Sequence, residues 1–291
     1  MIAVALAAFQ LAAAVPVRPG SARDRATPSR PSLAADGHPR LVGETRTVVV
    51  DAGHGGVDPG MSGPIGASHK VYEKDITLAV ALKVGAALKA AGVNVVYTRT
   101  TDTLINLYDR GPIANQAHAN LFISVHVNAA NPRWKSAGAA RGFETYFLSE
   151  AKTEDERRVE AMENSAARFD TGEPIAKDDP LNFILNDMQQ NEHLRESMKL
   201  ADDVQSALGT VEPGPDRGVQ QANFAVLRTA FMPAVLVEIG FGSNARDVDF
   251  MTNGNDQTRL AHAIADAAVD YLNNYWSGVN GVAARTSGGN P

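Results

Sequence analysis

Cysteine is absent from this chain, and its absence excludes several classes of site at once. Without thiols there is no disulfide, no thiolate zinc site and no cysteine nucleophile, so histidine, aspartate and glutamate remain as candidate metal ligands. Positive charge is also scarce, because 27 Lys and Arg residues face 33 Asp and Glu residues, giving a net charge of −6. We therefore expect no basic surface for a phosphate backbone and no nucleic-acid partner.

Long apolar runs are lacking too, and we expect no membrane span. The most apolar stretch, residues 1–16, is short for a membrane-crossing helix. Its alanine-rich end resembles the cleavage site of a secretory signal peptide, although no basic residue lies near Met1. The alternative is a short buried helix. Residues 17–45 mix Pro, Arg, Ser, Asp and Gly without periodicity, which predicts a disordered linker.

A glycine-rich turn after a short apolar run is the first motif that points to chemistry. The β-branched residues at 48–50 predict a buried strand, which Gly53-His54-Gly55-Gly56 follows closely. In an open α/β sheet, ligands bind beyond the carboxyl ends of the strands, so His54 lies where chemistry is common. The chain continues as another turn rather than as a helix, which argues against a phosphate-binding loop. His54 is therefore a candidate metal ligand or general base.

Apolar patterns predict an α/β fold for residues 46–276. A helix is expected over residues 73–91, because apolar residues recur there at three- and four-residue spacings and Gly92 ends the pattern. Strands on either side of this helix predict a parallel pair. The other expected elements are strands at 93–98, 121–126, 143–148, 222–227 and 234–239, and helices at 108–118, 150–208 and 257–275. Together they predict a single domain, a mixed, mostly parallel central sheet with helices on both faces, and a disordered tail at 277–291.

Candidate ligands gather at the ends of the predicted strands. His54, His126 and Glu238 each follow an apolar strand, and Glu73 opens the helix after the glycine-rich turn. A strand-end histidine is often a hydrogen-bonded structural residue, and an acidic residue in a first helical turn also suits the helix dipole. A buried, ionised Glu238, however, needs a cation or hydrogen-bond donors. Two histidines and a carboxylate form a common hydrolytic zinc site beside which a further glutamate acts as base, and the spacing leaves open which glutamate has which role.

Residues 46–274 resemble the zinc-dependent N-acetylmuramoyl-L-alanine amidases that cut bacterial peptidoglycan (the Amidase_3 type, which includes division-associated cell-wall amidases). The resemblance rests on many segments in one order rather than on a single motif. These segments are Asp51–Gly56, Asp58–Gly60, Glu73–Leu78, Thr98-Arg99, Asp102, Arg110, Ser124–Ala129 and Pro233–Asn244.

The resemblance implies that His54, Glu73 and His126 bind Zn²⁺ and that Glu238 is the catalytic base. It implies hydrolysis of the amide bond between N-acetylmuramic acid and L-alanine, for cell-wall remodelling or daughter-cell separation, by a periplasmic or secreted enzyme. Peptidoglycan is the expected partner, and we expect a monomer. Two alternatives stay open: a zinc peptidase acting on the stem peptide, and a non-catalytic wall-binding module. The intact base at Glu238 argues against the second, because a pure binder has no need of it.

A polar helical insertion, at about residues 150–200, lies between His126 and Glu238. In the division-associated members of the family, a helix in this interval covers the active site until a partner displaces it, which implies an activator protein as a second partner. The stretch 156–167 resembles that helix, and Glu163 or Glu160 is the candidate blocking residue, with a slight preference for Glu163. The alternative is a solvated charged helix.

Other polar residues are given smaller roles. Asn128 is expected either to contact substrate or to orient its neighbour His126. Arg99 and Arg110 match the family pattern and are expected to be structural, paired with Asp102 or Asp109. His69 precedes Glu73 and could line the cleft. The histidines of the linker, the last helix and the other helical stretches are given no role; they are His38, His262, His118 and His193.

Overall fold

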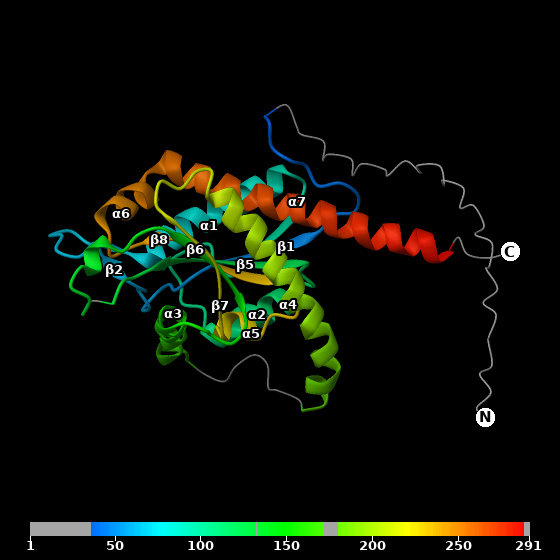
Figure 1. The fold of residues 1–291 in the computed structure, drawn as a ribbon, viewed down its shortest axis with the longest axis horizontal. Coiled ribbons are helices and arrows are strands. Elements are labelled where there is room, and N and C mark those ends of the chain that lie inside the picture. Colours follow the sequence, from blue (N-terminus) through cyan, green and yellow to red (C-terminus); the bar gives the residue numbers. More distant parts are fainter. Residues whose placement is uncertain (1–35, 132, 172–179, 288–291) are drawn as a thin grey trace, which may run out of the picture. The chain divides into compact units, whose positions relative to one another are not determined.

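One sheet of six strands forms the centre of the fold, in the order β4-β1-β5-β8-β6-β7 (Figure 1). The computed structural model describes residues 36–131, 133–171 and 180–287. Neighbouring strands are parallel except β6 and β8, which are antiparallel, so the predicted mixed, mostly parallel sheet is confirmed. Its strands are β1 (Thr47–Ala52), β4 (Asn94–Tyr97), β5 (Leu121–Asn128), β6 (Phe143–Leu148), β7 (Asp216–Ala222) and β8 (Ala234–Phe241), and a separate ribbon pairs β2 (Ser62–Gly63) with β3 (Val71–Tyr72).

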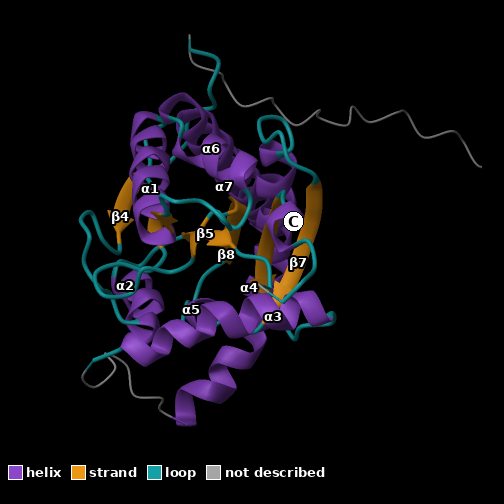
Figure 2. Ribbon diagram, turned by 90° about the vertical axis from the view of Figure 1, so that its left-hand side faces the viewer, coloured by secondary structure: helices purple, strands orange, loops and turns teal. Residues whose placement is uncertain are grey.

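Helices cover both faces of this sheet, as predicted (Figure 2). Alternate residues of a strand face opposite sides, so in β1 Val48 and Val50 pack into one apolar core and Val49 into the other. Residues of α1 (Glu73–Ala90), α4 (Pro180–Leu208), α6 (Ala245–Thr252) and α7 (Gly254–Ser287) complete the first core. Residues of α2 (Arg110–Gln116), α3 (Glu154–Asn164) and α5 (Ala225–Arg228) complete the second. Short 3₁₀ turns lie at η1 (Leu107–Asp109), η2 (Ala137–Ala139) and η3 (Ser165–Phe169).

The position of the site follows from the connections of β1. The chain leaves β1 and passes through α1 to β4 on one side, then through α2 to β5 on the other side of β1. Where successive connections leave a strand in opposite directions along the sheet, a crevice opens at the carboxyl ends of the two adjacent strands, here β1 and β5. Residues after β1 and at the end of β5 therefore meet at one edge of the sheet.

Two predictions for the second half of the chain are wrong. A strand was expected over residues 222–227, but the strand is β7, which ends at Ala222, and α5 follows it. As an edge strand, β7 is only half-buried and polar, so it lacks the apolar run of a central strand. Helix α6 was not expected at all. It begins where the Asn244 side chain accepts hydrogen bonds from the N–H groups of Arg246 and Asp247, which is a helix N-cap.

Both ends of the domain extend further than predicted. Helix α7 continues past the expected end at Tyr275 through residues 277–287, which were expected to be disordered and include the strong helix formers Ala283 and Ala284. At the other end, Leu41 N–H donates to the Ala91 carbonyl (2.9 Å), so part of the expected linker packs on the domain. The predicted signal peptide, residues 17–35 of the linker and residues 288–291 lie outside the described residues. Within the described part of the chain, no helix is long and apolar enough to cross a bilayer.

Candidate metal centre

His54 stands in the turn after β1 with a backbone conformation that few side chains adopt. Its φ is 61°, in the left-handed region, and strain of this kind is typical of functional positions. Its Nδ1 lies 2.7 Å from Asp58 Oδ2, four residues on in the same turn. A carboxylate on one ring nitrogen fixes the ring and directs the other nitrogen outward, as is common for metal-bound histidine. His54 Nε2 is thereby aimed into the crevice.

His126 and Glu73 complete the part of the site that the sheet and α1 supply. Glu73 is the first residue of α1, and its two oxygens accept hydrogen bonds from Val127 N–H (2.8 Å) and Met61 N–H (2.9 Å). His126, near the end of β5, approaches the backbone of the turn so closely that a Cβ on Gly53 would lie 2.5 Å from its ring. Glycine is therefore required at position 53 for the imidazole to fit.

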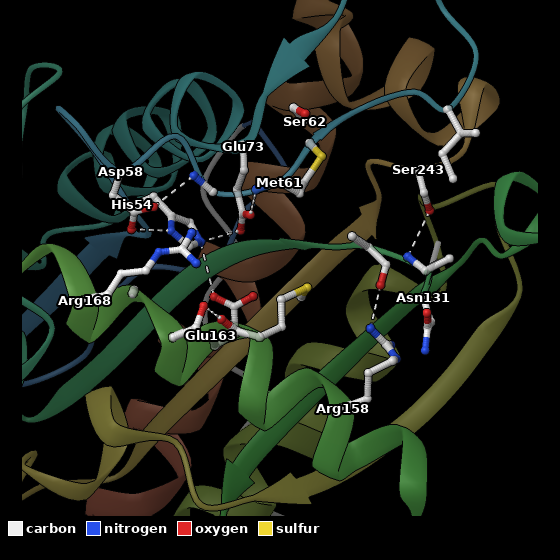
Figure 3. Close-up of a pocket in the computed structure, with 17 residues that line it drawn as sticks. His54, Asp58, Met61, Ser62, Glu73, Asn131, Arg158, Glu163, Arg168 and Ser243 are labelled. Carbon is white, nitrogen blue, oxygen red and sulfur yellow. Dashed lines mark hydrogen bonds and ion pairs between the residues drawn. The ribbon is translucent and has the colours of Figure 1, made fainter. Parts of the chain in front are cut away.

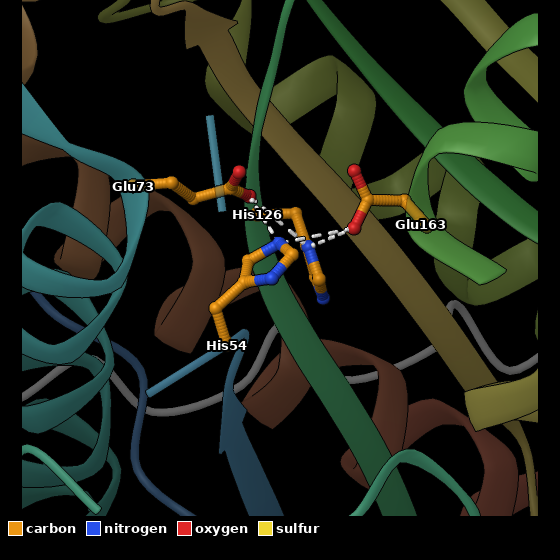
Figure 4. A group of neighbouring side chains, drawn as sticks. All are labelled: His54, Glu73, His126 and Glu163. Carbon is orange, nitrogen blue, oxygen red and sulfur yellow. Dashed lines mark hydrogen bonds and ion pairs between the residues drawn. The ribbon is translucent and has the colours of Figure 1, made fainter. Parts of the chain in front are cut away.

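A fourth side chain joins them from α3 (Figure 4). Glu163 Oε2 lies 2.8 Å from His126 Nδ1 and 3.2 Å from His54 Nε2, while Glu73 Oε1 lies 3.2 Å from each of these nitrogens. One donor atom from each of the four buried residues lies within 4.8 Å of all the others. Donors bound to one tetrahedral zinc ion are roughly 3.3 Å apart. The spacing therefore matches what a single metal ion requires.

The charges of the group also call for a cation. Although burial disfavours its charged form, the pKa of His54 is raised well above its ordinary value by Glu73, Asp58 and Glu163. Burial opposes charge on His126 as well, yet Glu163 and Glu73 raise the pKa of His126 to about 9. The contacts of Glu163 Oε2 with His126 Nδ1 and His54 Nε2 are ion-pair contacts that lack hydrogen-bond geometry, and Glu163 Oε1 makes no hydrogen bond at all. Buried nitrogen and oxygen atoms that surround one point without hydrogen bonds between them fit a metal ion better than a hydrogen-bond network.

Glu238 lies beside this group on β8, in register with His126 of β5. Its side chain is fully buried, and neither carboxylate oxygen has a hydrogen-bond partner. Burial, followed by the nearby Glu163 and Glu73 carboxylates, raises the pKa of Glu238 well above its usual range. A carboxylate with a raised pKa beside a group of ligands is suited to accept a proton and to return it.

A cavity of about 410 Å³ opens next to the candidate ligands (Figure 3). His54, Glu73 and Glu163 line it, and part of the wall comes from the chain after β5 and from α3. The other lining residues include Met61, Ser62, Ile65, Ala129, Ala130, Asn131, Arg158, Met162, Arg168 and Ser243. The cavity is large enough for part of an extended ligand.

Comparison with known proteins agrees with this geometry. A family model described as N-acetylmuramoyl-L-alanine amidase (Amidase_3) matches residues 48–270. The chain belongs to this amidase family. It is 33% identical over 233 residues to the N-acetylmuramoyl-L-alanine amidase AmiA of Escherichia coli, covering 79% of this chain and 77% of AmiA. The crystal structure of an N-acetylmuramoyl-L-alanine amidase from Clostridium difficile 630 aligns with a TM-score of 0.57 at 30% identity, over 78% of this chain and 97% of that one.

The other predicted site residues, Glu160, Asn128 and His69, do not belong to the group of candidate ligands. Glu160 accepts a hydrogen bond from Asn223 N–H (3.1 Å), so α3 brings Glu163 and not Glu160 to the group. Asn128 is fully buried, donates to Glu144 and accepts from Arg158 Nη2 (3.2 Å), which ties the end of β5 to α3. His69 is exposed and does not line the cavity.

The arginine pairings were predicted wrongly. Arg110 pairs with buried Asp51 (2.8 Å), and Arg99 donates to the carbonyls of Ala52 and Gly53, while Asp102 pairs with Lys74 (2.7 Å). Both arginines therefore hold the turn that carries His54, which is structural as expected but through other partners. Two groups were missed by sequence reasoning: Asp58, signalled only by its four-residue spacing from His54, and the Arg158–Asn128 contact, which no spacing in the sequence indicates.

Proposed function

We propose that this amidase is a zinc enzyme that hydrolyses the amide bond between N-acetylmuramic acid and the L-alanine of the peptidoglycan stem peptide. The observation that carries the proposal is the buried His54, Glu73 and His126 set with Glu238 beside it. When bound there, zinc would polarise the amide carbonyl and lower the pKa of a water molecule toward neutrality.

The chain's own residues then have separate tasks. Glu238 accepts the proton of the attacking water and returns it to the leaving amine of L-alanine, for which its raised pKa suits it. Asp58 orients His54, and the N–H groups of Met61 and Val127 orient Glu73, so that the ligand geometry is fixed before substrate arrives. The cavity beside the ligands receives the sugar and peptide on either side of the bond.

Product analysis from purified sacculi tests the reaction. Hydrolysis by the proposed route releases stem peptides that begin with L-alanine and leaves glycan strands with free lactyl carboxylates. Cleavage within the stem peptide would identify a zinc peptidase instead. The same assay should be run with zinc-loaded protein from which α3 has been deleted. If that protein releases no soluble product, it is a wall-binding module and the proposal is contradicted.

We further propose that α3 inhibits the enzyme by placing Glu163 in the donor position that water and substrate need. A capping box of Thr153 and Glu156 starts this helix. Val159 is its one apolar residue that is fully buried in the described structure, and Glu163 docks through its contacts with His126 (2.8 Å) and His54 (3.2 Å). Much of the docking is charged. Arg158 donates to the Ala129 carbonyl, and Asp155 pairs with Arg217 (2.7 Å). Contacts of this kind release more readily than a packed core.

The remaining parts of the proposal concern the setting of the enzyme. An activator protein that binds the outer face of α3 would withdraw Glu163 and couple hydrolysis to cell-wall remodelling or daughter-cell separation. A substrate in the wall places the enzyme in the periplasm or outside the cell, in agreement with a signal peptide at residues 1–16. We propose that residues 46–276 form the catalytic domain and that it acts as a monomer.

A further inference from the structure

A second group of potential metal ligands lies where the segment before β1 crosses α7. Arg40 and Val42 bracket this crossing, because the Asn273 side chain donates to the Arg40 carbonyl (3.0 Å) and accepts from Val42 N–H (2.8 Å). His38 precedes this crossing and lies against α7. Neither His38 nor any residue of α7 belongs to the metal centre described above.

Three side chains converge at this crossing. His38 Nδ1 lies 2.7 Å from Asp266 Oδ2, and the rings of His38 and His262 stack with centroids 4.1 Å apart. His262 and Asp266 are four residues apart on α7, a spacing that places both on one face of the helix. One donor atom from each of the three residues lies within 4.8 Å of the other two.

The group has one unsatisfied ring nitrogen and a further buried carboxylate beside it. His262 Nδ1 is buried without a hydrogen-bond partner, and so is Asp270 Oδ1, one turn further along α7. Burial, then the neighbouring Asp266 and then Asp203 raise the pKa of Asp270, so a cation bound here would relieve the repulsion between these carboxylates. The nearby Lys83, which shares a cavity with His262, directs its ammonium to Gly254 O and Gln257 Oε1 instead.

We propose that His38, His262 and Asp266 form a second metal site, which fastens the segment before β1 to α7. Two imidazoles and one carboxylate favour Zn²⁺ and similar transition metals over Ca²⁺ or Mg²⁺, which prefer oxygen donors. The bare ion pair holds this segment weakly, because the side chains of His38 and Asp266 are 36% and 33% exposed. Since ligand atoms of one zinc ion are roughly 3.3 Å apart, rotation of the partly exposed His38 side chain would close the set.

Zinc titration of the full chain tests this site separately from the catalytic one. In a His54→Ala/His126→Ala background the first site is removed, and we expect one equivalent of Zn²⁺ to bind by equilibrium dialysis. Adding His38→Ala, His262→Ala or Asp266→Ala should weaken that binding by at least about 10–100-fold. Loss of a residue that only orients a ligand already weakens metal binding by about that factor, and these substitutions remove a ligand itself. Adding His69→Ala, which removes an exposed histidine outside the group, should leave it unchanged.

Two further measurements keep the test decisive if the background variant folds poorly. Parent protein with both sites intact should carry about two equivalents of zinc, and His38→Ala about one. Zinc should also slow tryptic cleavage after Arg40 in the parent but not in His262→Ala. Equal zinc content in the parent and His38→Ala, with equal rates of cleavage, would overturn the proposal and leave an ordinary ion pair; it would say nothing against the catalytic zinc.

Discussion

The metal centre has two halves that are built differently. His54, Glu73 and His126 come from the sheet and α1, and backbone hydrogen bonds, an orienting carboxylate and close packing hold them. Glu163 comes from α3, which is docked largely through charged side chains such as Asp155 and its partner Arg217, each 31% exposed. Partly exposed ion pairs contribute little free energy, whereas the residues of the first half are buried and held by several hydrogen bonds each or by close packing.

Under the proposed inhibition by α3, the first half is permanent and the second half is removable. Three donors fixed by the fold can hold a metal whether or not α3 is docked. The fourth donor arrives on a helix whose loss exposes few apolar side chains. Substitutions in the two halves should therefore have opposite effects on turnover, and the following predictions test this contrast from the largest effect to the smallest.

The largest effect is expected when a ligand of the permanent half is removed. His126→Ala leaves two fold-supplied ligands, which cannot close a zinc site, so the variant should carry one equivalent of zinc less than the parent and show no measurable hydrolysis of sacculi. Metal analysis after dialysis and dye release from labelled sacculi measure both. Unchanged zinc content in His54→Ala and in His126→Ala would refute the ligand assignment.

Glu238→Gln should lower turnover without changing zinc content, because Glu238 lies beside the permanent half and is not one of its ligands. The amide retains the size of the side chain but cannot accept a proton, so turnover should fall about 10²–10⁴-fold while zinc content stays at the parent level. Turnover is best compared in a background with α3 released, where the parent rate is high. Loss of zinc in Glu238→Gln would mean that this residue is a ligand and that the two glutamate roles are misassigned.

The removable half should respond in the opposite direction. Arg158→Ala deletes the hydrogen bonds to Asn128 and Ala129 and the stacking on Trp134, and charged hydrogen bonds are worth about 1.5–3 kcal/mol each. An opening equilibrium shifted by that amount raises the open population, and hence turnover, at least about tenfold. Glu163→Ala should likewise raise turnover, whereas Glu154→Ala, exposed on the same helix, should not.

A deletion gives the stronger version of this test. Removing residues 154–191 leaves every strand of the sheet in place, so a folded product by circular dichroism should be faster than the parent and independent of any activator. A folded deletion with the parent's rate would make α3 a solvated surface helix without a regulatory role.

The same contrast explains what could be predicted from the sequence. Strands β1, β5 and β8 lie side by side, are parallel to one another and are buried on both faces. Each is therefore an apolar run in the sequence, and the polar residue at or after its end is easy to locate. Two ligands of the permanent half, His54 and His126, and the neighbouring Glu238 were therefore visible in the sequence. Which glutamate binds metal came from the family resemblance and not from spacing.

Elements that are held by polar contacts have a weaker apolar periodicity in the sequence. The edge strand β7 and the short helix α6 have no long apolar period, and both were missed. The choice between Glu160 and Glu163 depends on how α3 is rotated over the sheet, which its own sequence does not state. His38 and Asp266 are 228 positions apart, so only the folded chain brings them together.

The smallest effect is expected at Glu212, a buried carboxyl group that lies outside the site. Burial, followed by the nearby Asp247, raises the pKa of Glu212 to about 8, and neither of its oxygens has a hydrogen-bond partner. Below about pH 4.3 this residue is protonated in both the folded and the unfolded chain, so it costs nothing. As the pH rises toward 8 the unfolded chain loses the proton while the folded chain keeps it, and the free energy of unfolding falls.

Glu212→Gln removes this penalty. It should raise the free energy of unfolding by about 1–2 kcal/mol at pH 8, a figure reduced for residual solvent screening, and by close to nothing at pH 4. Urea titrations of the variant and the parent at both pH values measure the difference, with exposed Glu154→Gln as the matched control. Because Glu212 lies outside both halves of the metal centre, turnover and zinc content should not change.

An equal gain in the free energy of unfolding at both pH values would show that the benefit comes from packing rather than from the proton that Glu212 keeps in the folded chain. A loss of stability at pH 8 would mean that the folded protein stabilises the ionised Glu212, which would contradict the prediction.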